Sequence, residues 1–107
     1  MITAEWLRSQ RACEYQIRLF EATFPEGAGP DDAERARAAG LSLGWLAGNP
    51  SAPPPALERL ASDADARVRR YVAGNPSTPP PALGRLASDA NVDVRGCVAG
   101  NPSAPRL

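Results

Sequence analysis

The sequence predicts an all-α protein built as a short solenoid of helical repeats, and two observations support this fold class. One phrase occurs three times at intervals of 26 residues, as LAGNPSAP at 46–53, VAGNPSTP at 72–79 and VAGNPSAP at 98–105. Aligned with each other, residues 48–73 and 74–99 differ at only seven of 26 positions. Self-similarity at a fixed period of this size is typical of tandem units that stack to bury their apolar faces.

The first half of each repeat is expected to be a short helix over the segment PPPALGRLASD. Thr78 is a suitable N-cap and Pro79 a suitable first helical residue, because a missing N–H costs nothing there. Leu83, Leu86 and Ala87 then follow at helical spacing and form one apolar stripe. A helix of this length is unstable alone, so either helix of a repeat can be 3₁₀ in part and must pack on its neighbours.

The second half of each repeat is expected to be another helix, over VDVRGCVA. Asn91 is positioned to cap it, and Val94 and Val98 lie one turn apart on one face. Gly100 is expected to end the helix in the left-handed conformation, and the following Asn-Pro cannot continue it. The repeated phrase is therefore the corner between successive units.

The N-terminal third is expected to be helical as well. Apolar residues in 3–24 fall on one face of a helix of about six turns: Trp6, Cys13, Ile17, Phe20 and Phe24. Asp31 and Asp32 offer caps for a second helix, AERARAA, which Gly40 ends, and Ser42 begins the short piece LGWLA. We therefore expect one structural domain, with a capping helix and loop at 1–29, and at 30–107 a degenerate first repeat, two full repeats and a truncated third.

The segment NPSTPPPALGRLASDANVDVRGCVAGNP resembles the leucine-rich repeat variant family, and the resemblance extends over residues 46–105. The resemblance implies a right-handed stack of short helices, comparable in architecture to the HEAT and armadillo arrays. The repeat here is longer than the family's usual repeat, which we attribute to the extra proline in PPP, and the third copy breaks off at Pro105.

Composition narrows the function. Twelve basic residues, all arginine, face twelve acidic ones, and there is no histidine. The neutral balance gives no general attraction to nucleic acid or to a membrane, and the arginine-only basic set is typical of a GC-rich bacterial genome. No segment resembles a signal peptide or a membrane span, so a cytoplasmic location is expected. Cys13 and Cys97 are expected to be small buried residues, and no cofactor or metal is expected.

Several polar residues recur unchanged in the repeats and are expected to build the array. An aspartate between the helices and an arginine six residues later can bridge adjacent units as a ladder of ion pairs. The asparagine of each Asn-Pro corner is expected to fix the turn through bonds to neighbouring backbone. Contact with a ligand remains the alternative for the ion pairs. The residues are Asp63, Asp89, Arg69, Arg95, Asn49, Asn75 and Asn101.

The differences between repeats indicate where a partner binds. Most fall on the second helix, away from its valine stripe, and make Arg67, Arg70, Tyr71 and Asp93 candidates for partner contact; neutral drift of exposed positions is the alternative. Trp45, Tyr71 and Cys97 occupy one register position, which predicts core fillers of decreasing size or, alternatively, a ladder in a groove.

Three functional hypotheses follow. The favoured one is a non-enzymatic scaffold or adaptor that binds a protein partner of unknown identity. The alternative is nucleic-acid binding through Arg67, Arg69, Arg70 and Arg95. An enzyme that depends on Cys13 or on an acid is a minor third, because no histidine is available to shuttle protons.

The chain stops after the third corner, where no further helix covers the second repeat. We expect the exposed end to be covered by Leu107, by a different protein or by a second copy of the chain. A single leucine is too small, so we expect a homodimer through the open C-terminal end.

Overall fold

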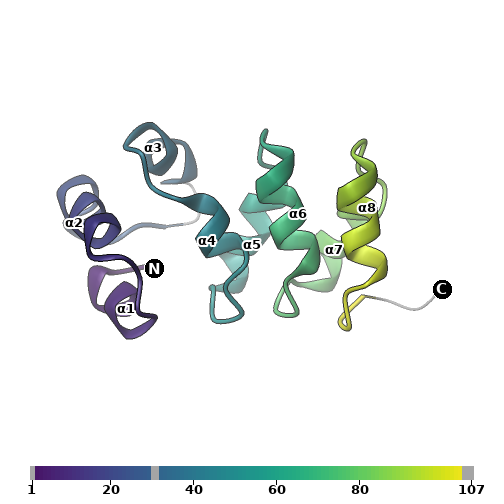
Figure 1. Cartoon of the computed structure of the whole chain (residues 1–107), viewed down its shortest axis with the longest axis horizontal. Coiled ribbons are helices and arrows are strands. Elements are labelled where there is room, and N and C mark those ends of the chain that lie inside the picture. The colour runs from purple at the N-terminus through teal and green to yellow at the C-terminus, as the bar shows by residue number, and fades with distance from the viewer. Residues whose placement is uncertain (1, 30–31, 105–107) are drawn as a thin grey trace. The chain divides into compact units, whose positions relative to one another are not determined.

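The computed structural model describes residues 2–29 and 32–104, and in this part of the chain helices joined by turns and loops make up the fold (Figure 1). The helices are α1 (Ala4–Ser9), α2 (Glu14–Thr23), α3 (Ala33–Ala38), α4 (Leu43–Ala47), α5 (Pro54–Leu60), α6 (Ala66–Gly74), α7 (Pro80–Leu86) and α8 (Val92–Ala99). Within these ranges the extended backbone pairs only in one antiparallel bridge, between Ile2 and Ala28. The predicted all-α class is confirmed. The chain forms two compact units, Met1–Leu43 and Gly44–Leu107.

The first unit encloses a small aromatic core. Ile17, Phe20 and Phe24 lie on one face of α2 and are buried, and the two phenylalanine rings are 5.3 Å apart between centroids. Leu7 of α1 is also buried, as the α1–α2 packing requires. The guanidinium of Arg35 lies 4.8 Å from the centroid of the Phe24 ring, a cation–π distance that joins α3 to this core.

The prediction of one helix over residues 3–24 is wrong, because the chain turns sharply at Arg11. This residue has a φ of 57°, in the left-handed region. The N–H of Arg11 donates to the carbonyl of Arg8 and that of Ala12 to the carbonyl of Leu7, the two bonds of a Schellman motif. The motif ends α1 and lets α2 fold back against it. The spacing of the apolar residues across 6–24 gave no indication of this break between the two helices.

The break also places Cys13 at the surface. It is the N-cap residue of α2 and is exposed, so the prediction that it is buried is wrong; Cys97 is half-buried. The later parts of this segment follow the prediction more closely, since Gly40, with a φ of 91°, ends α3 in a second Schellman motif. Of the two proposed caps, Asp32 occupies the N-cap position of α3, but its side chain makes no capping hydrogen bond and instead accepts a bond from the N–H of Gly29; Asp31 lies outside the described residues.

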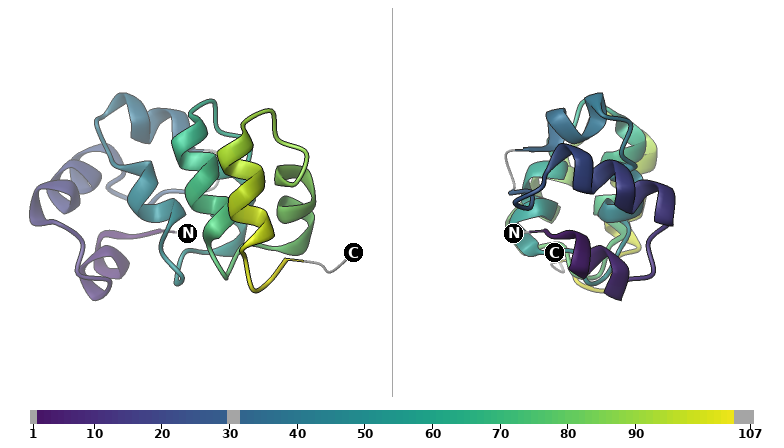
Figure 2. Two further views of the ribbon diagram at one scale, coloured as in Figure 1. Left: turned by 45° about the vertical axis from the view of Figure 1, so that its right-hand side comes forward. Right: turned by 90° about the vertical axis from the view of Figure 1, so that its left-hand side faces the viewer.

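The second unit contains the repeats, arranged in two layers. The second helices of the repeats, α6 and α8, lie side by side, and α5 and α7 pack behind them (Figures 1 and 2). Within α5, α6, α7 and α8 the buried residues are those of the predicted stripes together with small alanines between them: Ala56, Leu57, Leu60, Val68, Val72, Ala73, Ala82, Leu83, Leu86, Val94 and Val98. Because most of these side chains are small, neighbouring helices must approach closely for the core to fill.

Three details at the helix ends differ from expectation. Thr78 is not the N-cap of α7; its hydroxyl is buried and donates to the carbonyl of Val72, and Pro79 takes the cap position instead. Ala87 is exposed at the C-cap and does not extend the leucine stripe. Gly100 has a φ of −86°, so it is not left-handed, and the following Asn-Pro ends α8. Asn91 does cap α8, accepting bonds from the N–H groups of Asp93 and Val94, as predicted.

The buried stripe gives the first prediction. Leu86 is 1% exposed, so Leu86→Ala should lower the free energy of unfolding by about 2–4 kcal/mol through lost burial and a residual cavity. Arg67→Ala, on the exposed side of α6, should leave the melting temperature close to that of the wild type. Thermal and urea unfolding followed by circular dichroism measure both. The reverse ranking contradicts the assignment of faces.

Candidate functional site

The asparagines at the corners join each repeat to the one before it. The side-chain amide of Asn75 donates to the carbonyls of Ala47 and Asn49, at 2.8 Å each. The amide of Asn101 makes the same two bonds one repeat later, to Ala73 at 2.7 Å and to Asn75 at 2.9 Å. These side chains therefore fix not only their own turns, as the sequence suggests, but also the register between repeats.

Each of these asparagines also holds its own corner. The Oδ1 atoms of Asn49, Asn75 and Asn101 accept bonds from the N–H two residues later, at 2.8 to 2.9 Å. Serines of the same corners add a further bond between repeats. Ser103 donates from its hydroxyl to the carbonyl of Pro76 at 2.6 Å, and Ser77 donates in the same way to Pro50. Sequence reasoning missed the serines, although they recur with the corner.

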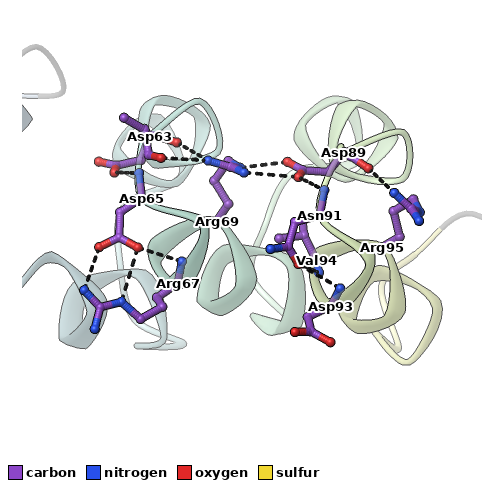
Figure 3. A network of polar contacts seen from close by, with 10 residues as sticks. Asp63, Asp65, Arg67, Arg69, Asp89, Asn91, Asp93, Val94 and Arg95 are labelled. Carbon is purple, nitrogen blue, oxygen red and sulfur yellow. Dashed lines mark hydrogen bonds and ion pairs between the residues drawn. The ribbon is translucent and has the colours of Figure 1, made fainter.

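The aspartates and arginines form a second set of contacts on the other side of the repeats (Figure 3). The guanidinium of Arg69 is bidentate to the carboxylate of Asp89 in the next repeat, with its Nε 2.8 Å and its Nη2 3.2 Å from the two oxygens. Its Nη1 donates to the carbonyls of Asp63 and Ala64 in its own repeat. Arg69 thus links one inter-helix turn to the next.

Each aspartate also shapes the turn it stands in. Oδ1 of Asp63 accepts a bond from the N–H of Asp65 at 2.8 Å, and Oδ1 of Asp89 accepts one from the N–H of Asn91 at 2.9 Å. The hydrogen bond from Arg69 holds the pKa of Asp89 below its ordinary value, and the same bond raises the pKa of Arg69. Both groups therefore carry their charge at neutral pH, and their side chains are only 11% and 18% exposed.

Arg95 occupies the position of Arg69 one repeat later but makes fewer contacts. Its Nη1 donates to the carbonyl of Asp89 at 2.6 Å, as the Nη1 of Arg69 does to Asp63. Within residues 32–104 its guanidinium forms no ion pair within 4 Å of a carboxylate. The predicted ladder therefore has one complete rung between repeats, and Arg95 is exposed at its end.

The exposed surface of the second helices carries two large aromatic side chains. Tyr71 is 48% exposed and Trp45, at the same register position in α4, is 38% exposed, so the prediction that they are core fillers is wrong. A Cβ atom on Gly44 would lie 3.3 Å from the Tyr71 ring, and one on Gly48 would lie 3.4 Å from it. The ring therefore rests on the backbone of α4. The sequence analysis did not predict this contact of the ring with Gly44 and Gly48. Two glycines four residues apart, in a repeat that is followed by one with an aromatic residue, are a sequence signal that could have indicated it.

The remaining candidate residues surround this ring or lie on α8. The guanidinium of Arg70 lies 5.8 Å from the centroid of the Tyr71 ring, within cation–π range. Arg67 pairs instead with Asp65, at 3.2 Å, and the hydrogen bond that its guanidinium donates to that carboxylate raises the pKa of Arg67. Asp93 is exposed on α8, away from this cluster. The structure thus brings Arg67, Arg70 and Tyr71 onto one helix and leaves Asp93 on the next.

Within residues 2–29 and 32–104 two kinds of feature are absent. These residues contain no cluster of three histidine, cysteine, aspartate or glutamate side chains suited to a metal ion. No helix formed by them has the length and apolar character needed to cross a membrane.

Paired short helices that recur at a fixed spacing and are joined by repeated side-chain bonds define a helical repeat protein. Residues 66–91 match the family model described as leucine rich repeat variant. The match confirms the resemblance suggested by the sequence and covers the segment from the start of α6 to the cap of α8. No curated protein and no solved structure matches the chain.

A comparison of two equivalent arginines tests the ladder. Arg69→Ala should lower the free energy of unfolding by about 2–4 kcal/mol, because it leaves the largely buried carboxylate of Asp89 unpaired. Arg95→Ala removes the same side chain where no carboxylate of the next repeat faces it, so the loss should be much smaller. Chemical denaturation of both variants measures the difference. Equal losses contradict a role for the ion pair between repeats.

The lowered pKa of Asp89 gives a pH prediction. A carboxyl whose pKa is lower in the folded state stabilises the fold above its ordinary pKa of 3.8, and that contribution is lost as the pH falls through the folded-state value. The wild type should therefore lose stability in acid more steeply than Asp89→Asn, which has no proton to bind there. Urea midpoints at pH 6, 4 and 3, roughly spanning this window, measure the two slopes. Parallel slopes contradict the prediction.

Proposed function

We propose that this chain is a non-enzymatic scaffold that binds a protein partner through the exposed surface of α4 and α6. The observation that carries the proposal is the Tyr71 ring, half exposed yet held against the backbone at Gly44 and Gly48. An aromatic side chain that is already ordered loses little entropy when a partner packs on it. Tyrosine and arginine are also the residue types most enriched among those that dominate binding energy.

The charges around Tyr71 indicate which kinds of side chain a partner would place against this surface. Arg67 is neutralised by Asp65 and Arg69 by Asp89. Arg70, by contrast, has no carboxylate partner among the described residues and lies over the aromatic ring. A segment with one carboxylate beside an apolar side chain complements this pair, because the carboxylate meets Arg70 while the apolar group covers Tyr71.

Nucleic-acid binding is the weaker candidate. Of the four arginines that this function would use, Arg67 and Arg69 form ion pairs with aspartates, and the chain as a whole is neutral. Phosphate binding would have to displace these carboxylates, which repel phosphate themselves. The contacts therefore favour a protein partner over a polyanion.

A selection of displayed random peptides on the whole chain tests the proposal. We expect the selected peptides to be enriched in aspartate or glutamate next to an apolar residue. Arg70→Ala and Tyr71→Ala should each weaken their binding by about tenfold or more. Arg59→Ala removes an exposed arginine from α5 instead and serves as the matched control.

Two results would count against a protein-binding surface at Tyr71. The first is a set of peptides whose affinity is unchanged by both variants. The second is tight binding of random DNA that falls steeply as salt is added, since that slope reports released counterions.

A further inference from the structure

The exposed face of α8 differs from that of α6 in a consistent way. Four positions on this face differ between the two helices. At three of them α6 has an exposed arginine or tyrosine where α8 has a smaller or acidic residue, and at the other α8 has a larger, exposed apolar side chain. From α6 to α8 these are Ala66 to Val92, Arg67 to Asp93, Arg70 to Gly96 and Tyr71 to Cys97. The result is a smoother and less basic surface on the same backbone.

The centre of this face is a stripe suited to close helix packing. Val92, Gly96 and Gly100 follow one another at intervals of four residues and so lie along one side of the helix. All three are exposed, and Val92 is 67% exposed. A Cβ atom on Gly96 would meet nothing within 4 Å. The structure shows that such a pair of glycines can accept an aromatic ring, because the ring of Tyr71 lies against Gly44 of α4 and Gly48 just after it.

Opposite charges flank the stripe. With about 100° between successive residues, Asp93 lies on one side of Val92 and Arg95 on the other. Both are exposed, the carboxylate of Asp93 forms no ion pair within the described chain, and Arg95 contacts only the carbonyl of Asp89 there. At the equivalent positions α6 carries Arg67 and Arg69, two like charges. The face of α8 is therefore complementary to itself, and that of α6 is not.

We propose that α8 is a self-association surface, on which the α8 helices of two copies pack in parallel about a two-fold axis. In that arrangement the Asp93 side of one helix meets the Arg95 side of the other, which gives two equivalent ion pairs around the glycine stripe. An antiparallel pair would instead place the two Asp93 sides against each other and the two Arg95 sides against each other. Asp93 and Arg95 differ in height by about 3 Å along the helix, a gap that the long arginine side chain spans.

This surface is separate from the one proposed for a protein partner, which is centred on α6 and α4. A contact limited to one helix from each copy is smaller than the roughly 1,600 Å² of a standard interface, so the dimer is weak and favoured by high concentration and low salt. The two proposals can therefore fail independently.

Sedimentation of the whole chain from about 10 µM to 1 mM in low salt is the test, a range suited to a weak complex. The wild-type mass should rise from one chain toward two. Asp93→Arg and Arg95→Asp should each remain monomeric alone, since each sets like charges against each other. Mixed in equal amounts they should form a dimer, because every pair across the axis is then opposite in charge.

Two further variants keep the result interpretable. Val92→Ala removes only exposed surface and should weaken association several-fold with an unchanged melting curve. Arg70→Ala changes the α6 surface and should leave association unaffected. Circular dichroism confirms that the charge variants are folded. A wild type that is monomeric over the whole range overturns the proposal, and so does a mixture of charge variants that fails to dimerise.

Discussion

The buried side-chain amide of Asn75 determines how one repeat meets the next. It is 2% exposed, and its two N–H bonds end on carbonyls of the preceding repeat while its oxygen holds its own corner. One acceptor, the carbonyl of Ala47, belongs to the last turn of α4, where no further turn is present to supply a donor, and the other, that of Asn49, lies in the corner that follows. Without the amide, the carbonyl of Ala47 would lose this partner between packed repeats, and leaving a buried acceptor unsatisfied costs more than the bond itself contributes. Asn101 repeats the arrangement, so the same constraint acts twice.

This constraint matters because the apolar core cannot set the register alone. Leucine, valine and alanine make up most of the buried surface of the second unit, and contacts among such small side chains change little if a helix shifts along its neighbour. Directional bonds have no such tolerance. The side chains of Asn75, Asn101 and Ser103 and the bidentate pair of Arg69 with Asp89 all reach the adjacent repeat. We infer that polar bonds specify the spacing that apolar burial stabilises, which is the best-supported role for buried polar groups.

The sequence predicted the repeat, its two helices, the valine and leucine stripes and the cap at Asn91, because period and spacing encode which face is buried. It did not predict details that depend on how one element meets its neighbours. Thr78 looks like a cap when only the next helix is considered, but its hydroxyl bonds backwards to the end of α6. Arg11 adopts a left-handed φ that its residue type does not favour, because the packing of α1 on α2 requires a turn there. Trp45 and Tyr71 looked like core residues because apolar type alone does not reveal which side of a helix faces solvent.

The contact of Tyr71 with α4 shows why positions on the outer face do not vary independently. The ring of Tyr71 lies against Gly44 of α4 and Gly48 just after it; a Cβ atom at residue 44 would lie 3.3 Å from the ring and crowd it, whereas one at residue 48 would make an ordinary contact at 3.4 Å. In α8 the glycine pair is retained, at 96 and 100, while the aromatic position holds Cys97. The equivalent pair in α6 is Arg70 and Gly74. Because one member is an arginine, this pair leaves no bare backbone against which a ring at residue 97 could pack. The size of an outer residue is thus set by the helix before it. A repeat array of this kind can present an aromatic and basic surface on one helix and a smooth surface on the next while the bonds between repeats remain the same.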